Sequence, residues 1–363
     1  MKNVGELCII STKKHYTRKV TEMKESFGVR ADGQQAYLYT ITGGKLTAKI
    51  SDHGATLVQL HVPDGEGNMA DVVLGFEDPA GYENSTAFHG AIVGRNANRV
   101  RNASFEMNGR KIALDPNDHG IHNLHSGFHP LHNRLWQVVE HKANEISLRL
   151  QSPDGDQGFP GNAVIQVTYA LEADNILRIT YDGICDKDTV FNMTNHSYFN
   201  LAGHEKTELA LKQLLTMPAR FFNPDDAQNI PTGECREVAG TPMDFRSPME
   251  IGKRIGEDYA PLLLQDGYDH NFEVFANPCA ILKDPTSGRC MCISTDCPGV
   301  QFYSGNFLQD EMGKNGAAYC RRGGIALETQ YFPDSVNHPE WKQPFVKAGQ
   351  RYHSETCYRF WAE

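Results

Sequence analysis

The sequence predicts an all-β protein, and two observations support this prediction. Hydrophobic and polar residues alternate with a period of two in several segments, which is typical of strands with one buried face. Helical periodicity is scarce, while 33 glycines and 18 prolines supply frequent turns. Strands that are separated by turn residues, with few helices between them, indicate a β-sandwich or a β-barrel.

The predicted strands follow one another along the chain, and each is bounded by Gly, Asp, Asn or Pro. They cover residues 45–62, 145–152, 163–171 and 176–185. The best candidate for a helix is short and lies in residues 247–259. No low-complexity tract, repeat of fixed period or Pro/Ser linker divides the chain. We therefore expect a single β-sandwich domain over residues 29–363, with residues 1–28 as a peripheral extension.

Composition and charge are those of an ordinary globular protein with an excess of acidic groups. Of 363 residues, 40% are hydrophobic and 22% are charged, and the net charge is −10. This charge argues against nucleic acid or an anionic membrane as the main partner, because both attract basic surfaces. No apolar run approaches the roughly 20 residues that span a bilayer, and the N-terminus is a poor secretory signal. Nine cysteines without a CxxC pair fit free thiols, so we expect a cytoplasmic protein.

An arginine-rich segment, residues 94–105, is the first candidate for a binding surface. In an extended strand, Arg95, Arg99 and Arg101 would project to one side. An inward arginine is costly unless it meets an acceptor such as a carboxylate or a substrate hydroxyl. The alternative is a surface strand whose arginines are solvated.

A histidine-rich segment, residues 118–132, is the second candidate. It holds His119, His122, His125, His129 and His132. The spacings of three and four residues would suit metal ligands on a helix. Gly120, Gly127 and Pro130 argue against a continuous helix, however. The pattern therefore favours a loop that sends one histidine into a pocket over a metal site, with solvated histidines as the remaining alternative.

Two titratable residues in apolar or aromatic surroundings are candidates for proton transfer. His196 lies within FNMTNHSYFNLAGH, residues 191–204, and a histidine can give or take a proton at neutral pH. Glu328 follows the apolar segment GGIAL, where desolvation raises the pKa of a carboxylate and suits it to act as a general base. The alternatives are a core histidine satisfied by hydroxyl groups and a glutamate that is paired with Arg99.

Two further residues have side chains that suit the recognition of hydroxyl groups. Asp269, in DGYDHNFEV, could bind sugar hydroxyls or orient a histidine, although a turn aspartate is the alternative. Gln301 shares a strand face with Tyr303 and has an amide that can both donate and accept hydrogen bonds. Together the candidates supply one acid, one base and several hydroxyl-binding groups. This combination fits proton transfer on a small polyhydroxylated molecule.

Eight motifs, in this order, resemble the aldose 1-epimerase or galactose mutarotase family. They are VVLGFEDPAGY (72–82), GRNANRV (94–100), NLHSG (123–127), NMTNHSYFNLAGH (192–204), TPMDFRSP (241–248), GYDHNF (267–272), PGVQFYSGNF (298–307) and ALETQYFPDSVNHPEW (326–341). The resemblance runs from about residue 27 to the C-terminus. It implies a large antiparallel β-sandwich of the galactose mutarotase-like supersandwich type, with few short helices. It also implies interconversion of the α and β anomers of free aldohexoses such as galactose and glucose, with no cofactor and no metal.

The resemblance further implies roles for individual residues. His196 would be the acid that protonates the ring oxygen, and Glu328 would be the base that takes the proton of the C1 hydroxyl. The residues expected to hold the sugar are Asn98, Arg99, His125, Asp269 and Gln301. The chain has Ser126 where the family usually has the second residue of HGG, and His129 and His132 are additional, so the preferred aldose stays open. We expect a small aldose as partner, neither nucleic acid nor membrane, and a monomer or homodimer.

Two alternative functions remain at this point. A sugar-phosphate 1-epimerase of the same fold would need an anion-binding cluster, for which Arg95 and Arg101 near Arg99 are candidates. The acidic net charge disfavours it. A non-catalytic carbohydrate-binding β-sandwich module would need aromatic platforms but no paired acid and base, and the presence of both His196 and Glu328 argues against it.

Overall fold

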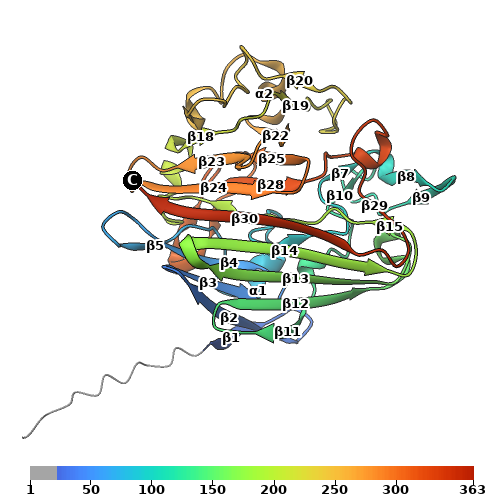
Figure 1. Ribbon diagram of the computed structural model, residues 1–363, viewed down its shortest axis with the longest axis horizontal. Coiled ribbons are helices and arrows are strands. Elements are labelled where there is room, and N and C mark those ends of the chain that lie inside the picture. The colour runs from blue at the N-terminus through green and yellow to red at the C-terminus, as the bar shows by residue number, and fades with distance from the viewer. Residues whose placement is uncertain (1–22) are drawn as a thin grey trace, which may run out of the picture.

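The protein folds into packed antiparallel β-sheets with few short helices, which confirms the all-β class predicted from the sequence. The computed structural model describes residues 23–363. The largest sheet has nine strands, and its long strands lie side by side across the molecule (Figure 1). In spatial order the strands are β11 (Gln137–His141), β12 (Glu145–Ser152), β13 (Ala163–Glu172), β14 (Ile176–Cys185), β30 (Tyr352–Ala362), β24 (Arg289–Thr295), β23 (Ala280–Lys283), β18 (Leu214–Thr216) and β21 (Met249–Glu250).

A six-stranded sheet packs against this large sheet. Its strands, in spatial order, are β17 (Tyr198–Phe199), β28 (Ile325–Gln330), β25 (Gly299–Tyr303), β22 (Asp269–Glu273), β19 (Phe221–Phe222) and β20 (Arg236–Glu237). The ring of Phe199 on β17 lies 5.4 Å from the ring of Tyr358 on β30. The hydroxyl groups of Thr329 on β28 and Thr356 on β30 are hydrogen-bonded at 2.5 Å. These contacts join the two sheets face to face, as expected for a sandwich.

A five-stranded meander completes the sandwich at the N-terminal end of the described chain. It consists of β1 (Lys24–Val29), β2 (Gln35–Gly43), β3 (Leu46–Ser51), β4 (Leu57–Pro63) and β5 (Met69–Asp71). The Tyr169 hydroxyl on β13 donates to the carbonyl of Ala55 at 2.7 Å, which ties the meander to the nine-stranded sheet. Buried side chains from all three sheets belong to one hydrophobic core.

Short strand pairs and helices connect the three sheets. The pairs are β6 (Ile92–Val93) with β16 (Thr194–Asn195), β7 (Arg99–Val100) with β10 (Asn123–Leu124), β8 (Ser104–Met107) with β9 (Arg110–Ala113), β15 (Thr189–Val190) with β29 (Phe345–Val346), and β26 (Glu311–Met312) with β27 (Ala318–Tyr319). The α-helices are α1 (Pro79–Asn84) and α2 (Ala260–Gln265), and the remaining helical segments are 3₁₀ turns. Among residues 23–363, no helix has the length and apolar character needed to cross a membrane.

Three of the predicted strands are confirmed to within one residue, as β12, β13 and β14. β13 and β14 pair without interruption from Ala163 opposite Cys185 to Glu172 opposite Ile176. Their inward side chains are buried, whereas those of the opposite face are more exposed. The alternation of the sequence therefore corresponds to a sheet with one face on the core.

Two other predictions differ from the structure. The predicted strand 45–62 is two strands, β3 and β4, because Gly54 and Ala55 take left-handed φ values of 70° and 49°. The predicted helix 247–259 is wrong, since Met249 pairs with Leu215 in a strand and only a single 3₁₀ turn follows. Two glycines in that segment disfavour a longer helix.

The predicted N-terminal extension falls mainly outside the described residues. Residues 1–22 are not part of the described chain. Residues 24–28 form most of β1 and are hydrogen-bonded to β2, so this part of the predicted extension belongs to the meander.

Candidate active site

A cleft of about 200 Å³ opens at one end of the six-stranded sheet. Glu328 lies on β28 and pairs with Gln301 on the neighbouring strand β25. On the other side of β28, Tyr198 pairs with Ala326, and this antiparallel register brings His196 beside Glu328. Asp269 begins β22. The sheet therefore delivers residues from distant parts of the chain to one cleft.

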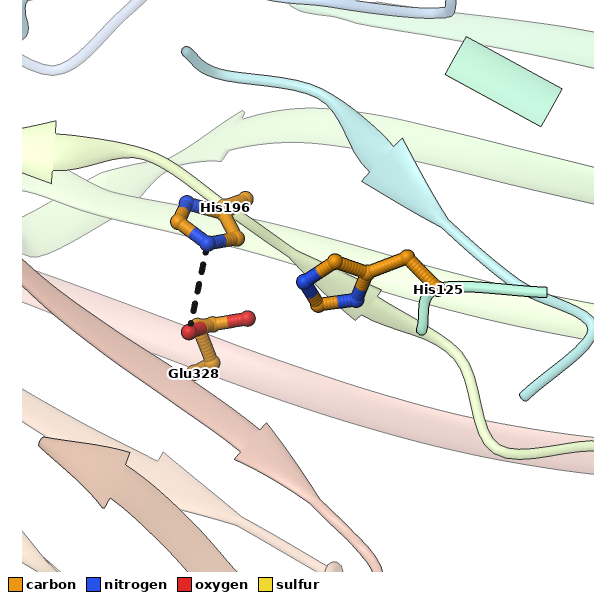
Figure 2. Close-up of side chains that lie close together, drawn as sticks. All are labelled: His125, His196 and Glu328. Atoms are coloured by element: carbon orange, nitrogen blue, oxygen red, sulfur yellow. Dashed lines mark ion pairs between the residues drawn. The ribbon is translucent and has the colours of Figure 1, made fainter. Parts of the chain in front are cut away.

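Glu328 and His196 form a close pair inside this cleft. His196 Nε2 lies 3.5 Å from Glu328 Oε1, and their side chains are only 6% and 3% exposed (Figure 2). Burial lowers the pKa of His196 to about 3. Burial also raises the pKa of Glu328 well above its usual value, and Asp269 adds to this effect while Arg99 opposes it. Both groups thus favour their neutral forms, with the proton that they share resting mainly on Glu328.

His125 faces the same pair from the loop that follows β10 (Figure 2). Its ring centroid lies 5.6 Å from that of His196. The backbone N–H of Asn98 donates to His125 Nδ1 at 3.2 Å, so the neutral ring carries its proton on Nε2. Burial lowers the pKa of His125 well below its usual value, which keeps the ring neutral. His125 is therefore a neutral hydrogen-bond donor through Nε2.

The same three residues raise the question of a metal ion, because their ligand atoms lie within 4.8 Å of one another. A metal-bound histidine normally donates its other N–H to an acceptor. His125 Nδ1 instead accepts from the Asn98 N–H, and this hydrogen bond would be lost if Nε2 were a metal ligand. The hydrogen bonding of His125 therefore favours a proton-transfer site over a metal site.

The remaining residues of the histidine-rich segment do not gather around one point. His119 and His129 are exposed, whereas His122 Nδ1 accepts the Asn102 N–H at 3.0 Å. The ring of His132 lies 4.9 Å from that of Phe88. The segment is thus a loop that places His125 in the cleft, as the sequence pattern predicted for one of its histidines.

Ser126 adopts a conformation that normally favours glycine, with a φ of 77°. Its hydroxyl accepts the Asn96 N–H at 2.8 Å and donates to the Asn96 carbonyl at 3.0 Å. These two hydrogen bonds connect the loop that carries His125 to the loop that precedes β7. They offset the backbone cost of a serine at this position.

Arg99 is the arginine that lines the cleft. Its Nε donates to Asp118 Oδ2 at 2.9 Å, and the two side chains are 15% and 10% exposed. The backbone on either side is held by Asp334, whose N–H donates to the Arg99 carbonyl and whose Oδ1 accepts the Arg101 N–H, each at 2.9 Å. Nη1 and Nη2 of Arg99 have no hydrogen-bond partner among residues 23–363, so they are available to a ligand.

The prediction that three arginines share one side of a strand is wrong. Asn98 and Asn102 take left-handed φ values of 61° and 52°, which break the extended conformation. Arg95 is fully buried and donates mainly to backbone carbonyls, including that of Ser152 at 2.7 Å. Arg101 pairs with Asp226 at 2.8 Å, outside the residues that line the cleft.

Asp269 and Gln301 act as a hydrogen-bonded unit. Gln301 Nε2 donates to Asp269 Oδ1 at 2.7 Å. Asp269 lines the cleft, whereas Gln301 is buried behind it and is not part of the lining. Burial raises the pKa of Asp269, while Arg99 and the hydrogen bond from Gln301 lower it. The structure thus places six of the seven predicted site residues at the cleft and Gln301 in contact with one of them.

Other residues of the cleft were not singled out as site residues from the sequence. They are mostly apolar or aromatic: Thr86, Ala87, Phe88, Leu124, Tyr198, Tyr303, Phe307 and Leu308. Tyr303 shares a strand with Gln301, and Tyr198 follows His196 closely, so their positions were accessible to sequence reasoning. Phe88 carries no such signal. Phe307 ends the motif 298–307 and Asp118 begins the histidine-rich segment, but neither residue type marks a place in the cleft, and loops that meet only in the folded chain bring all three to the site.

Comparisons with known proteins agree over most of the chain. A sequence model of the family described as aldose 1-epimerase matches residues 37–359. The aldose 1-epimerase of Haemophilus influenzae is 39% identical and covers 91% of this chain and 97% of its own length. The galactose mutarotase of Bos taurus is 36% identical and covers 89% and 93%. A solved aldose epimerase homologue from C. elegans has a TM-score of 0.83 and 31% identity, and covers 90% of this chain and 99% of its own.

Proposed function

This chain belongs to the aldose 1-epimerase family, and we propose that Glu328 and His196 carry out the proton transfers of the epimerase reaction. The observation that carries the assignment is the 3.5 Å contact between His196 Nε2 and Glu328 Oε1 in a cleft. The proposed substrates are free aldohexoses such as galactose and glucose. The cleft, at about 200 Å³, is smaller than typical drug-sized sites, which supports a ligand the size of one sugar ring.

The proposed reaction needs two coordinated proton transfers. Glu328, as the carboxylate, removes the proton from O1, and His196, as the imidazolium, gives a proton to O5. The C1–O5 bond breaks and the sugar opens to the aldehyde. Rotation about C1–C2 presents the other face of the carbonyl, and ring closure runs both transfers in reverse. The enzyme therefore returns to its starting protonation state with no net uptake of protons.

The pKa directions distinguish the resting form of the pair from the form that reacts. Before opening, the pair is charged; afterwards, Glu328 is protonated and His196 is neutral. Burial favours the neutral pair, because it raises the pKa of Glu328 and lowers that of His196. The charged form is therefore the minor form of the resting pair, and burial favours its conversion to the neutral pair as the ring opens. General acid and base catalysis typically contribute about 10²- to 10⁴-fold each.

The neighbouring side chains supply the hydrogen bonds that would hold the sugar. His125 Nε2–H and the free Arg99 nitrogens are donors, and the Asp269 carboxylate is an acceptor. Asn98 Oδ1 already accepts a hydrogen bond from the backbone N–H of Arg99 at 2.8 Å, which leaves the side-chain amide N–H groups of Asn98 for sugar oxygens. Gln301 fixes Asp269 in this proposal and does not contact the sugar itself.

The two alternative functions fit these contacts less well. A sugar-phosphate 1-epimerase would require an anion site, yet Arg95 is occupied by carbonyl groups and Arg101 by Asp226. The cleft also holds the carboxyl groups of Asp269 and Glu328, which repel a phosphate when they are ionised. A non-catalytic binding module would have no use for a buried acid and base in contact.

The location and assembly of the protein are part of the same proposal. We place it in the cytoplasm, and the eight cysteines of the described chain, all unpaired, support a reducing compartment. We expect a monomer or a homodimer, with a small aldose as the partner and neither nucleic acid nor a membrane.

Polarimetry of freshly dissolved α-galactose and α-glucose tests the proposed function. The purified protein should accelerate the approach to the equilibrium rotation of at least one of the two sugars. If no common free aldose responded, the mutarotase assignment would fail and a binding module would be favoured. Activity that is restricted to a sugar phosphate would select the phosphate-specific alternative.

A further inference from the structure

The ring of Phe88 contacts three histidines at the cleft. Its ring centroid lies 4.7 Å from that of His125, 4.9 Å from that of His132 and 5.6 Å from that of His196. It lines the sugar cleft and also a separate small cavity of about 10 Å³. The ring therefore stands between the cleft and this second cavity.

The second cavity is lined in part by buried polar groups. His89 and His132 are among its lining residues, and their buried Nδ1 atoms have no hydrogen-bond partner among residues 23–363. A polar cavity with unpartnered nitrogen atoms takes up water once it is large enough. Removal of the Phe88 ring would enlarge it and join it to the cleft.

The backbone of Phe88 is held in an unfavourable conformation. Its φ of 58° is left-handed, a region that a bulky side chain rarely adopts. The Ala91 N–H donates to the Phe88 carbonyl at 3.1 Å and closes this turn. The turn is joined to His196 itself, since Gly90 N–H donates to the His196 carbonyl at 3.0 Å and His196 N–H donates to the Ala91 carbonyl at 2.9 Å.

We propose that Phe88 is a positioning residue whose ring fixes the imidazoles of His196 and His125 toward the sugar and keeps water from the second cavity away from His196. The inference rests on the proposed role of His196 as the acid. The strained turn serves this arrangement, because it ties the ring to the same backbone segment that carries His196. Strain that is maintained by surrounding contacts is frequent at functional sites.

The ring of Phe88 also affects the ionisation of His196. The titratable groups that face His196 are Glu328 on β28, Tyr198 on β17, His125 on the loop after β10, and His89 and His132, which line the second cavity. Burial is the main cause that lowers the pKa of His196. Water admitted by loss of the ring would reduce this effect, so the pKa of His196 should rise toward its ordinary value.

The test compares Phe88→Asn with Phe88→Tyr. Asparagine tolerates left-handed φ values and keeps the turn while it removes the ring, whereas tyrosine keeps the ring. Phe88→Asn should lower kcat by about 10- to 100-fold, the range expected when catalytic groups lose their alignment, with a smaller change in KM. The acidic limb of the pH profile, which follows protonation of His196, should move to higher pH. Phe88→Tyr should retain the wild-type kcat and the wild-type position of the acidic limb.

The matched control is Phe128→Leu, which changes an exposed phenylalanine of the histidine-rich segment that does not line the cleft. It should have wild-type kinetics. NMR titration of the histidine side chains gives a readout that does not depend on activity, and the His196 pKa should be higher in Phe88→Asn than in the wild type.

Three results would overturn the inference, and one would overturn the proposed function instead. Wild-type kcat in Phe88→Asn would remove the residue from the machinery. A lower kcat with an unchanged pH profile and an unchanged His196 pKa would indicate a purely structural role. A kcat and a pH profile in Phe88→Tyr that match those of Phe88→Asn would show that the aromatic ring does not position the histidines. Absence of mutarotase activity in the wild-type protein would refute the proposed function and not the role of the ring in setting the His196 pKa.

Discussion

Asp118 should orient the Arg99 guanidinium in the cleft and partly neutralise its charge. Its carboxylate accepts Arg99 Nε at 2.9 Å, and both side chains are largely buried. A hydrogen bond to a charged group contributes about 1.5–3 kcal/mol, and a neutral one about 0.5–1.5 kcal/mol. Asp118→Asn keeps a neutral acceptor, so it should cost about 1 kcal/mol in kcat/KM, which is about fivefold. Asp118→Ala should cost about 2 kcal/mol, or about thirtyfold.

The same substitutions should also move the pH profile. Burial raises the pKa of Glu328 and Arg99 lowers it. Asp118 partly neutralises Arg99, so its loss strengthens the lowering effect on Glu328. At high pH, kcat/KM falls when the pair loses the proton that rests mainly on Glu328. This basic limb of the pH profile should therefore move to lower pH in both variants.

Polarimetric measurement of kcat/KM over a range of pH values tests both effects. The matched control is Asp226→Asn, which weakens the similar pair of Asp226 with Arg101 away from the cleft and should leave the kinetics unchanged. If Asp118→Ala had wild-type kcat/KM and an unmoved basic limb, the reasoning about Arg99 would be refuted.

Three further predictions concern the surroundings of the acid–base pair. Gln301→Ala should raise KM because Asp269 loses the 2.7 Å hydrogen bond that fixes it, and unchanged kinetics would contradict this positioning role. Ser126→Ala should lower the free energy of unfolding, measured by urea denaturation, by about 1–3 kcal/mol, because it loses both hydrogen bonds to Asn96. Ser126→Gly should lower it less, because glycine adopts the left-handed φ without strain. A larger loss for Ser126→Gly than for Ser126→Ala would refute this argument. EDTA should leave the rate of mutarotation unchanged. A His125 ring that bound a metal through Nε2 would carry its proton on Nδ1, but Nδ1 accepts a hydrogen bond from the Asn98 N–H. A rate that falls on chelation and is restored by one metal would overturn this prediction.

Local sequence patterns predicted the strands well where the folded chain uses one simple geometry. β14 alternates between buried and less buried residues over its whole length, and β12 and β13 do so over part of theirs, so period-two alternation identified all three. The segment 45–62 shows the same alternation, but Gly54 and Ala55 turn the chain back in its middle. Alternation alone does not reveal such a reversal, because residues on both sides of it remain buried in the same core.

The sequence predicted those site residues whose chemistry is evident from the residue type and its neighbours along the chain. A glutamate in an apolar strand and a histidine among aromatic residues were distinguishable as Glu328 and His196. The partners that tune them were not, because Asp118 and Phe88 meet the site only through loops with left-handed residues and contacts distant in sequence. Gln301 was assigned to the sugar because an amide suits hydroxyl groups, whereas in the fold its Nε2 is engaged by Asp269.

The value of kcat for mutarotation by Glu328→Gln tests the central claim most directly. Glutamine keeps the shape and hydrogen-bonding reach of the side chain but cannot take a proton from O1. With the fold verified by circular dichroism, kcat should fall at least about 10²-fold, the lower end of the range for general acid–base catalysis. A fall of less than about tenfold would contradict the claim, since Glu328 would then be a structural carboxylate and Asp269 the next candidate for the base.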